Sequence, residues 1–207
     1  MAFQLISAFE PTAVTFSALE KTRKGSKVVW VNLPVAESGR GKLSLQTPTV
    51  ALPFGVSPYQ EASTGEIQSY SVDLSFRGSD TDARMAEFLA KMTALDELVL
   101  DAAVKNSKEW FGKQMSKEIV SEFYRRLVKS NNPAYPPVMK VKVQLNDGQP
   151  NAAFFDEARR PVTIDYLVKN TSVKMIIEAD RLWFINKVRV LSMSACLFVL
   201  SALSTAV

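Results

Sequence analysis

Residues 70–76, YSVDLSF, decide how this sequence folds. Every second residue is apolar, and a period of two is typical of a strand with one buried and one exposed face. Residues 138–145, VMKVKVQL, repeat the pattern with Lys140 and Lys142 on the polar side. Both stretches therefore predict strands of a sheet that covers a core on one side.

Further strand-like segments lie on both sides of these two. The strands that we expect are residues 27–33, 43–50, 152–156, 162–167, 173–179, 182–185 and a terminal strand that reaches Leu200. Pro48 should lie at a sheet edge or a strand end, because proline donates no hydrogen bond to a ladder. Residues 53–65, with two prolines and two glycines, are expected to form a long loop, and residues 146–148 (NDG) a hairpin turn.

The apolar period changes to three or four after residue 79, which predicts helices. The first is expected to be capped by Ser79 or Asp80 and to bury residues as far as Ala103. The second follows Gly112 and is capped by Ser116. Its expected buried residues are Ile119, Val120, Phe123, Tyr124, Leu127 and Val128. Residues 80–130 are therefore predicted to form a two-helix insertion between strands.

About eight short strands with one helical excursion favour a mainly β (α+β) fold. A partly closed barrel fits this order better than a parallel α/β sheet, in which helices would follow the strands throughout. A chain of 207 residues can bury one sizeable core, so we expect residues 1–207 to form a single domain.

The composition argues against an enzyme. The chain has no histidine and one cysteine, which removes histidine-based triads, the commonest metal ligand and any internal disulfide. The neighbouring acids Asp96 and Glu97, and Asp156 and Glu157, should point apart and are interpreted as solvated surface. Residues 39–41 (GRG) are too short for a phosphate-binding loop. Cys196 is expected to be structural, and neither a cofactor nor a metal is expected.

The two ends of the sequence are where a targeting segment would lie. The first residues lack the basic start and long apolar run of a signal peptide. Residues 190–207 carry no charge, but alternation from Leu191 to Val199 opposite Ser192, Ser194 and Cys196 favours a strand over a membrane anchor. A membrane-tethered protein would be excluded if residues 195–200 pair in the sheet. Residues 201–207 have no explanation in this pattern.

Positive charge is clustered along the sequence, although the net charge is only +4. Residues 21–42 and 105–129 are basic, residues 79–101 are acidic, and aromatic residues stand beside several of the cations. Single-strand nucleic acid needs both cations for its phosphates and exposed rings for its bases. Chance clustering on a solvated surface would explain the charges equally well. We expect Phe76, Phe88, Phe123 and Phe198 in the core, and leave Trp30, Tyr59, Trp110 and Trp183 open.

Several sequence blocks resemble a protein family found in large DNA viruses of eukaryotes. They are residues 43–56 (LSLQTPTVALPFGV), 70–76, 106–116 (NSKEWFGKQMS), 135–143 (YPPVMKVKV) and 154–162 (FFDEARRPV). Within that group the sequence resembles the replicative single-stranded DNA-binding proteins. Its C-terminal third is similar in layout to the oligonucleotide/oligosaccharide-binding (OB) fold proteins of this class in certain phages. The sequence departs from the phage proteins at residues 203–207 (LSTAV), which lack an acidic tail.

The resemblance implies an OB-fold-like barrel of about five core strands with added elements, acting in DNA replication or recombination. It also implies single-stranded DNA and replication enzymes as partners, an intracellular location in the host nucleus or a cytoplasmic viral factory, and leaves a homo-oligomer open. Residues that match its motifs include Lys108, Trp110, Lys113, Lys140, Lys142 and Trp183. With them, the expected DNA-binding residues are Lys27, Trp30, Arg40, Lys42, Tyr59, Arg77, Arg125, Lys174, Arg181 and Lys187.

The main alternative is a structural or assembly protein, such as a minor virion component, that uses the barrel for protein contacts. It predicts exposed rings in an uncharged apolar patch rather than among lysines. A histidine-free hydrolase is more remote and would need a pocket with converging carboxylates.

Overall fold

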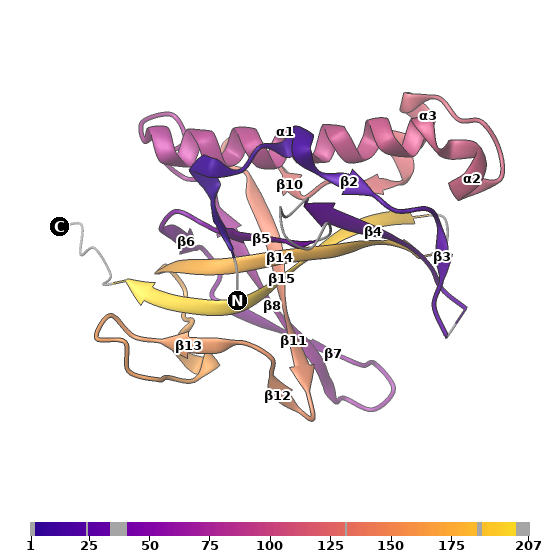
Figure 1. Cartoon of the computed structure of the whole chain (residues 1–207). Coiled ribbons are helices and arrows are strands. Elements are labelled where there is room, and N and C mark those ends of the chain that lie inside the picture. Colours follow the sequence, from indigo (N-terminus) through magenta and orange to yellow (C-terminus); the bar gives the residue numbers. More distant parts are fainter. Residues whose placement is uncertain (1–2, 24, 34–40, 131, 186–187, 202–207) are drawn as a thin grey trace.

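The computed structural model describes residues 3–23, 25–33, 41–130, 132–185 and 188–201 (Figure 1). Its centre is a closed ring of five strands. They are β6 (Val50–Leu52), β8 (Ile67–Ser75), β11 (Val138–Asn146), β15 (Val188–Ser201) and β14 (Thr171–Ile185). Each pairs with the next and β14 pairs with β6, so the predicted barrel is confirmed.

The two strands that were clearest in the sequence pair with each other. In the antiparallel register of β8 and β11, Val72 lies opposite Val141 and both are buried. On the other face Asp73 lies opposite Lys140, and the two side chains form an ion pair of 3.1 Å. The period of two therefore identified the inward and outward faces correctly.

Strand β14 organises the rest of the sheet. One of its edges pairs with β15 and the other with β6, β5 (Gly41–Gln46) and β4 (Lys27–Leu33). It is one strand where two were predicted, because a register irregularity between Ala179 and Leu182 bends it without ending it. A second shift places Cys196 as an extra residue in β15. Beyond it Phe198, not Val199, enters the core, so the predicted alternation is wrong there.

Short strands extend this sheet. They are β1 (Gln4–Leu5), β2 (Thr15–Phe16), β3 (Glu20–Lys21), β7 (Val56–Gln60), β9 (Tyr124–Arg125), β10 (Val128–Lys129), β12 (Gln149–Pro150) and β13 (Ala153–Phe155). The chain also forms 3-10 turns at η1 (Ile6–Ala8), η2 (Pro11–Ala13) and η3 (Ile164–Tyr166).

Three strand boundaries differ from the sequence prediction. Residues 43–50 are not one strand, because the chain breaks at residues 47–49, around Pro48, between β5 and β6. The loop expected at residues 53–65 contains β7, which pairs with β8. The strand expected at 162–167 is wrong, since η3 occupies it.

The insertion between β8 and β11 forms a helical layer over the barrel (Figure 1). It consists of α1 (Ala83–Lys105), α2 (Ser107–Phe111) and α3 (Lys117–Phe123). The N-cap of α1 is Asp82 and not Ser79 or Asp80 as predicted. Its side chain accepts a hydrogen bond from the Arg84 amide. Phe88 of α1 packs on Phe76 at the end of β8, with ring centroids 5.1 Å apart. No helix in the described part of the chain is long and apolar enough to cross a membrane.

The second predicted helix is shorter than expected. It ends at Phe123, and Ile119 is exposed instead of buried. The reason is Asp96 of α1, whose carboxylate accepts hydrogen bonds from the backbone amides of Leu127 and Val128. Because these amides bond to a side chain, the segment after α3 turns onto α1 and continues as β9 and β10.

Candidate nucleic-acid interface

The outward side of β14 carries the candidate site. Met175, Ile177 and Ala179 belong to the core, so the alternate residues face outward. Ile176 is buried but lies outside the core cluster, which agrees with this orientation. We call this side the β14 surface and define it by Lys174, Ile176, Glu178, Arg181 and Trp183 of β14, with Trp30, Lys42 and Gln46 of the adjoining strands. Along the strand it spans roughly 30 Å.

Arg181 lies near one end of the β14 surface, in contact with two tryptophan rings. Its guanidinium carbon lies 4.4 Å from the centroid of the Trp30 ring and 5.3 Å from that of Trp183. Both rings are half-buried, and the Trp30 Nε1 donates a 2.8 Å hydrogen bond to Glu20 that fixes its orientation. Cation–π contacts of this kind hold guanidinium and ring planes together. The result is a fixed group of planar surfaces with a positive charge.

An ion pair lies next along the surface. Lys42 of β5 approaches the Glu178 carboxylate at 3.8 Å, and the lysine is much the more exposed partner. On the neighbouring strand β15, the half-buried Cys196 thiol donates a hydrogen bond to the Ile176 carbonyl at 3.4 Å. Burial and the nearby Glu178 raise the pKa of Cys196 to about 11, so this cysteine is a neutral thiol at neutral pH.

The surface continues sideways across the barrel. Ser194 of β15 lies opposite Glu178 on one side and beside Lys142 of β11 on the other. Gln144 donates a 3.1 Å hydrogen bond to the Ser194 hydroxyl. Two strand spacings, about 10 Å, therefore separate Lys142 from Glu178.

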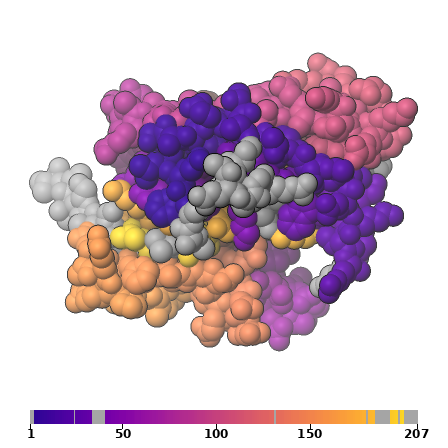
Figure 2. All heavy atoms as spheres, in the orientation of Figure 1, coloured from indigo at the N-terminus to yellow at the C-terminus, as the bar shows by residue number. Residues whose placement is uncertain are grey.

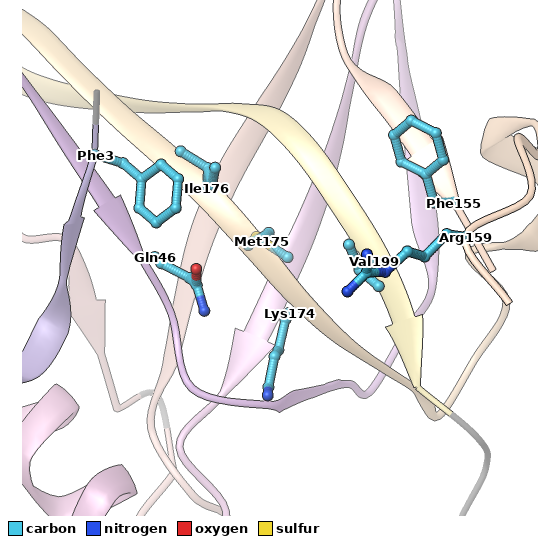
Figure 3. A pocket seen from close by; sticks show the side chains of 8 residues that line it. All are labelled: Phe3, Gln46, Phe155, Arg159, Lys174, Met175, Ile176 and Val199. Atoms are coloured by element: carbon cyan, nitrogen blue, oxygen red, sulfur yellow. The ribbon is translucent and has the colours of Figure 1, made fainter. Parts of the chain in front are cut away.

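A pocket of about 420 Å³ occupies the other end of the β14 surface (Figure 3). Its lining residues come from the N-terminal segment, β5, β13, the turn after β13, β14 and β15. They are Phe3, Gln46, Phe155, Arg159, Lys174, Met175, Ile176 and Val199. In the space-filling view, yellow atoms of β15 are visible between the indigo N-terminal segment and the orange β13 region (Figure 2).

Six of the predicted DNA-binding residues lie on the β14 surface or beside it. They are Trp30, Lys42, Lys142, Lys174, Arg181 and Trp183. Lys27 is at the start of β4 opposite Phe184, whose ring packs against the buried Trp110, so alternation along the strand places Lys27 on the other side of the sheet. Arg40 and Lys187 lie outside the described residues.

The other predicted residues lie elsewhere. Tyr59 is on β7, Arg77 follows β8, Arg125 is on β9, and Lys140 is paired with Asp73. Lys108 and Lys113 lie on α2 and just beyond it, in the helical layer. The structure thus divides the predicted set into a group along β14 and a dispersed remainder.

Trp110 requires a correction. Its side chain is 2% exposed, and its ring packs edge-on against Phe16 at 6.2 Å and Phe184 at 5.8 Å. The flanking lysines suggested an exposed ring, but Trp110 lies three residues after Ser107, which is also buried. This spacing marks the buried side of α2. Trp110 therefore offers no face to a base.

Asp96 requires a second correction, since it is buried and not solvated. It accepts hydrogen bonds from Tyr124 at 2.6 Å and from two backbone amides. Burial raises its pKa, while these hydrogen bonds oppose the rise. Its neighbour Glu97 binds Arg126 and Lys117. The described residues contain no group of three or more potential metal-binding side chains.

Of the eight pocket residues the sequence indicated only Lys174; the missed residues with a ring or a polar group are Phe3, Gln46, Phe155 and Arg159. Phe3 precedes β1, which is too short to show periodicity, and Gln46 was simply one polar residue in a strand. Phe155 and Arg159 stand four apart in FFDEARR, a combination of ring and cation similar to that of Trp183 and Arg181. That combination could have indicated them.

Comparison with protein families gives a direct match. The model of the "Family of unknown function (DUF5871)" matches residues 77–192. The chain belongs to this family. The DUF5871 match covers the helical layer, β11, strand β14 and the beginning of β15, but not β4 and β5. No curated protein matches the sequence. The predicted membership of a eukaryotic viral family stays a prediction.

Solved structures give a likeness of fold for this DUF5871 protein. It is similar to gp2.5, a single-stranded DNA-binding protein encoded by bacteriophage T7, with a TM-score of 0.50, 14% identity and coverage of 80% of this chain and 89% of gp2.5. A single-stranded DNA-binding protein from bacteriophage Enc34, solved with single-stranded DNA, matches with a TM-score of 0.44, 11% identity and coverage of 89% and 94%. The gp2.5 match supports the predicted likeness in layout to phage proteins. At this identity it shows the fold alone.

Proposed function

We propose that this protein binds single-stranded DNA along the β14 surface. The observation that carries the proposal is Arg181 held between two half-buried tryptophan rings, Trp30 and Trp183, on the outward side of a barrel strand. Lys42, Lys142 and Lys174 lie along the same side. The fold shared with gp2.5, whose description names it a single-stranded DNA-binding protein, supports the proposal.

The surface has the two parts that an unpaired strand needs. Lysines neutralise phosphates, and each neutralised phosphate releases counterions, so affinity falls as salt rises. Bases stack on aromatic rings and guanidinium planes, each stack contributing about 1–3 kcal/mol. A surface roughly 30 Å long suits the lower part of the range of about 4–16 nucleotides bound per OB fold. Because every base has a flat face, the binding is sequence-tolerant.

The proposal includes a biological setting. The protein coats exposed strands during replication or recombination of viral-type DNA in the host nucleus or a cytoplasmic factory. It contacts replication enzymes and performs no catalysis itself. This setting follows from the resemblance of sequence blocks such as residues 106–116 and 154–162, and it stays a prediction.

The test is a titration of fluorescently labelled oligo-dT followed by anisotropy at increasing salt. We expect binding at about 50 mM salt, weakening by roughly 0.7 log units per phosphate contact for each tenfold rise in salt. Arg181→Ala should bind about tenfold more weakly, because it loses both charge and stacking. Arg181→Lys keeps the charge and should recover only part of the loss.

The matched control is Lys105→Ala, which removes an exposed cation from the last turn of α1, away from the β14 surface. Its affinity should equal that of the wild type. Absence of binding at about 50 mM salt, or equal affinities for the Arg181→Ala and Lys105→Ala variants, would contradict the proposal.

Protein contact in an assembly is the second candidate function. Phe54, Tyr166 and Val168 are exposed apolar residues on two neighbouring loops. The loops meet at Gly55, where an added Cβ would lie 2.7 Å from the Leu167 carbonyl oxygen. Sedimentation of the Phe54→Ser/Val168→Ser variant separates the two functions. Self-association that this variant abolishes, without oligo-dT binding by the wild type, would favour assembly.

A further inference from the structure

We propose that the pocket at the Lys174 end of the β14 surface is a subsite that holds one unpaired nucleotide, with its base inside and its phosphate at the rim. The inference rests on the proposed function and deepens it. The juxtaposition that carries it is two phenylalanines from distant segments around an apolar floor, with two cations beside them (Figure 3).

The walls of the pocket suit a base. Phe3 and Phe155 stand on opposite sides of it, while Met175, Ile176 and Val199 form apolar surface between them (Figure 3). The pairing of the strands fixes this arrangement, because Val199 lies opposite Lys174 on one side and beside Phe155 on the other. A flat ring that enters such a pocket gains stacking and apolar contact.

The volume is also suitable. About 420 Å³ falls within the range of pockets that enclose small ligands, which is about 300–1,000 Å³. Gln46 is a polar residue of the lining, opposite Ile176 in the register of β5 and β14. Its amide provides both a donor and an acceptor for the edge of a base. Since an amide can present either group, it discriminates weakly between bases.

Two cations give the pocket its preference for an anion. Lys174 rises from β14, and Arg159 reaches it from the turn that follows β13. This turn is closed by Asp156, whose carboxylate accepts hydrogen bonds from the Arg160 amide at 2.8 Å and Nε at 2.7 Å. Arg159 adopts a φ of 61° at the tip. Arg160 is therefore used by the turn, and Arg159 contributes to the pocket.

The occupant follows from this charge pattern and from the position of the pocket. No acidic side chain is among the described residues that line it, so a phosphate beside Lys174 and Arg159 meets no repulsion there. Ile176 lines the pocket and lies two residues before Glu178 on the same side of β14. A strand bound along the β14 surface therefore reaches the pocket without changing direction. A nucleotide of the bound DNA fits the pocket better than an apolar peptide, because the peptide carries no negative charge to pair with Lys174 and Arg159.

The experiment compares two variants of neighbouring residues. Phe3 is 43% exposed and lines the pocket, whereas Leu5 is 52% exposed and does not line it. Phe3→Ala should weaken binding of oligo-dT about fivefold to tenfold, and Leu5→Ala should leave it unchanged. Similar exposure makes Leu5→Ala a matched control for the loss of an apolar side chain near the N-terminus.

An abasic oligonucleotide of the same length isolates the base. It keeps the phosphates but has nothing to place between the rings, so Phe3→Ala and wild-type protein should bind it equally. Arg159→Gln should weaken binding of both oligonucleotides. It should also reduce the slope of log affinity against log salt concentration by about 0.7, and Lys105→Gln should change neither quantity. Photocrosslinking of oligo-5-iododeoxyuridine should label the peptides that contain Phe3 or Phe155.

The outcomes separate this inference from the proposed function. If wild-type protein does not bind oligo-dT, the proposed function fails and the subsite fails with it. If wild-type protein binds and Arg181→Ala weakens it, but the Phe3→Ala and Leu5→Ala variants bind alike, the pocket is no subsite while the proposed function stands. Equal losses on normal and abasic strands for Phe3→Ala would also overturn the inference.

Discussion

The helical layer and the β14 surface are both charged, but their charges are used differently. In the helical layer Lys117 binds Asp101 at 2.8 Å and Glu97 at 3.0 Å, and Arg126 binds Glu97 at 2.7 Å. On the β14 surface Arg181 lies against aromatic rings, and Lys174 borders a pocket with no described acidic lining. The comparison teaches that cations clustered in the sequence can meet acidic partners in one part of the fold and aromatic rings in another, so a run of positive charge does not by itself locate a site for a polyanion.

The aromatic residues of the two regions differ in the same way. Trp110 of α2 is enclosed by Phe16, Phe111 and Phe184, whereas Trp183 remains half-exposed beside Arg181. Lysines flank Trp110 in the sequence more closely than they flank Trp183. Neighbouring charge therefore does not show whether a ring is accessible.

The largest expected effect is on stability and concerns the buried Asp96 carboxylate, which links α1 to the segment after α3 by hydrogen bonds. Asp96→Ala leaves two backbone amides and the Tyr124 hydroxyl without their acceptor. We expect a loss of about 3–4 kcal/mol in the free energy of unfolding, measured with urea. The control Asp101→Ala removes a carboxylate with an exposed ion pair and should cost less than about 1 kcal/mol. Equal losses would show that Asp96 is not structural.

The next effect concerns affinity. Trp30→Ala combined with Trp183→Ala removes both rings around Arg181, so oligo-dT should bind about a hundredfold more weakly. Tyr135→Ala, which removes an exposed ring outside the β14 surface, should not change the dissociation constant. Circular dichroism would establish that the double variant is folded. A folded double variant with unchanged affinity would remove the distinction between the two regions.

A smaller effect, of opposite sign, is expected at the acid of the β14 surface. Glu178→Gln removes a negative charge next to Lys42 and frees that lysine for phosphate. We expect binding of oligo-dT to become about threefold tighter at low salt. Glu122→Gln removes an exposed acid from α3 and should have no effect. Weaker binding by Glu178→Gln would indicate that DNA binding depends on the Lys42–Glu178 ion pair and not on a released Lys42.

The last prediction leaves affinity and stability aside and concerns the reactivity of Cys196. Since its pKa is raised from 9.0 to about 11, its thiolate fraction at pH 8 is about a hundredfold lower than that of an unshifted thiol. Iodoacetamide should therefore label the folded protein very slowly, and the rate should rise as pH approaches 11. Protein unfolded in urea provides the reference rate. Equal rates in the folded and unfolded states would show that Cys196 is not enclosed by the sheet.

Much of the barrel could be predicted because its strands show their faces in sequence. Residues 70–76 alternate cleanly and residues 27–33 are rich in β-branched and aromatic residues, and the structure forms β8 and β4 there. The strand predicted at 162–167 failed because its buried residues, Ile164 and Leu167, are three apart, which is a helical spacing. The bulge at Cys196 leaves no local signal, since it depends on the register with β14.

The candidate site could be predicted only in part, for a similar reason. The sequence indicated cations and rings such as Arg181 and Trp183, whose residue types suit DNA. It did not indicate the pocket, because Phe3 and Phe155 come to line the same pocket only through the pairing of β1 with β5 and of β13 with β15. Nor did it separate Lys174 from Lys140, because the acidic partner of Lys140 is Asp73, which the pairing of β8 with β11 places opposite it.

Tryptophan fluorescence tests the central claim most directly, because the chain has three tryptophans and the structure divides them. Trp30 and Trp183 lie on the β14 surface, and Trp110 is buried in the helical layer. Three variants would each keep one tryptophan and carry phenylalanine at the other two positions. Saturating oligo-dT should quench the proteins that keep Trp30 or Trp183 and leave the Trp110 protein unchanged. Quenching confined to the Trp110 protein would contradict the account.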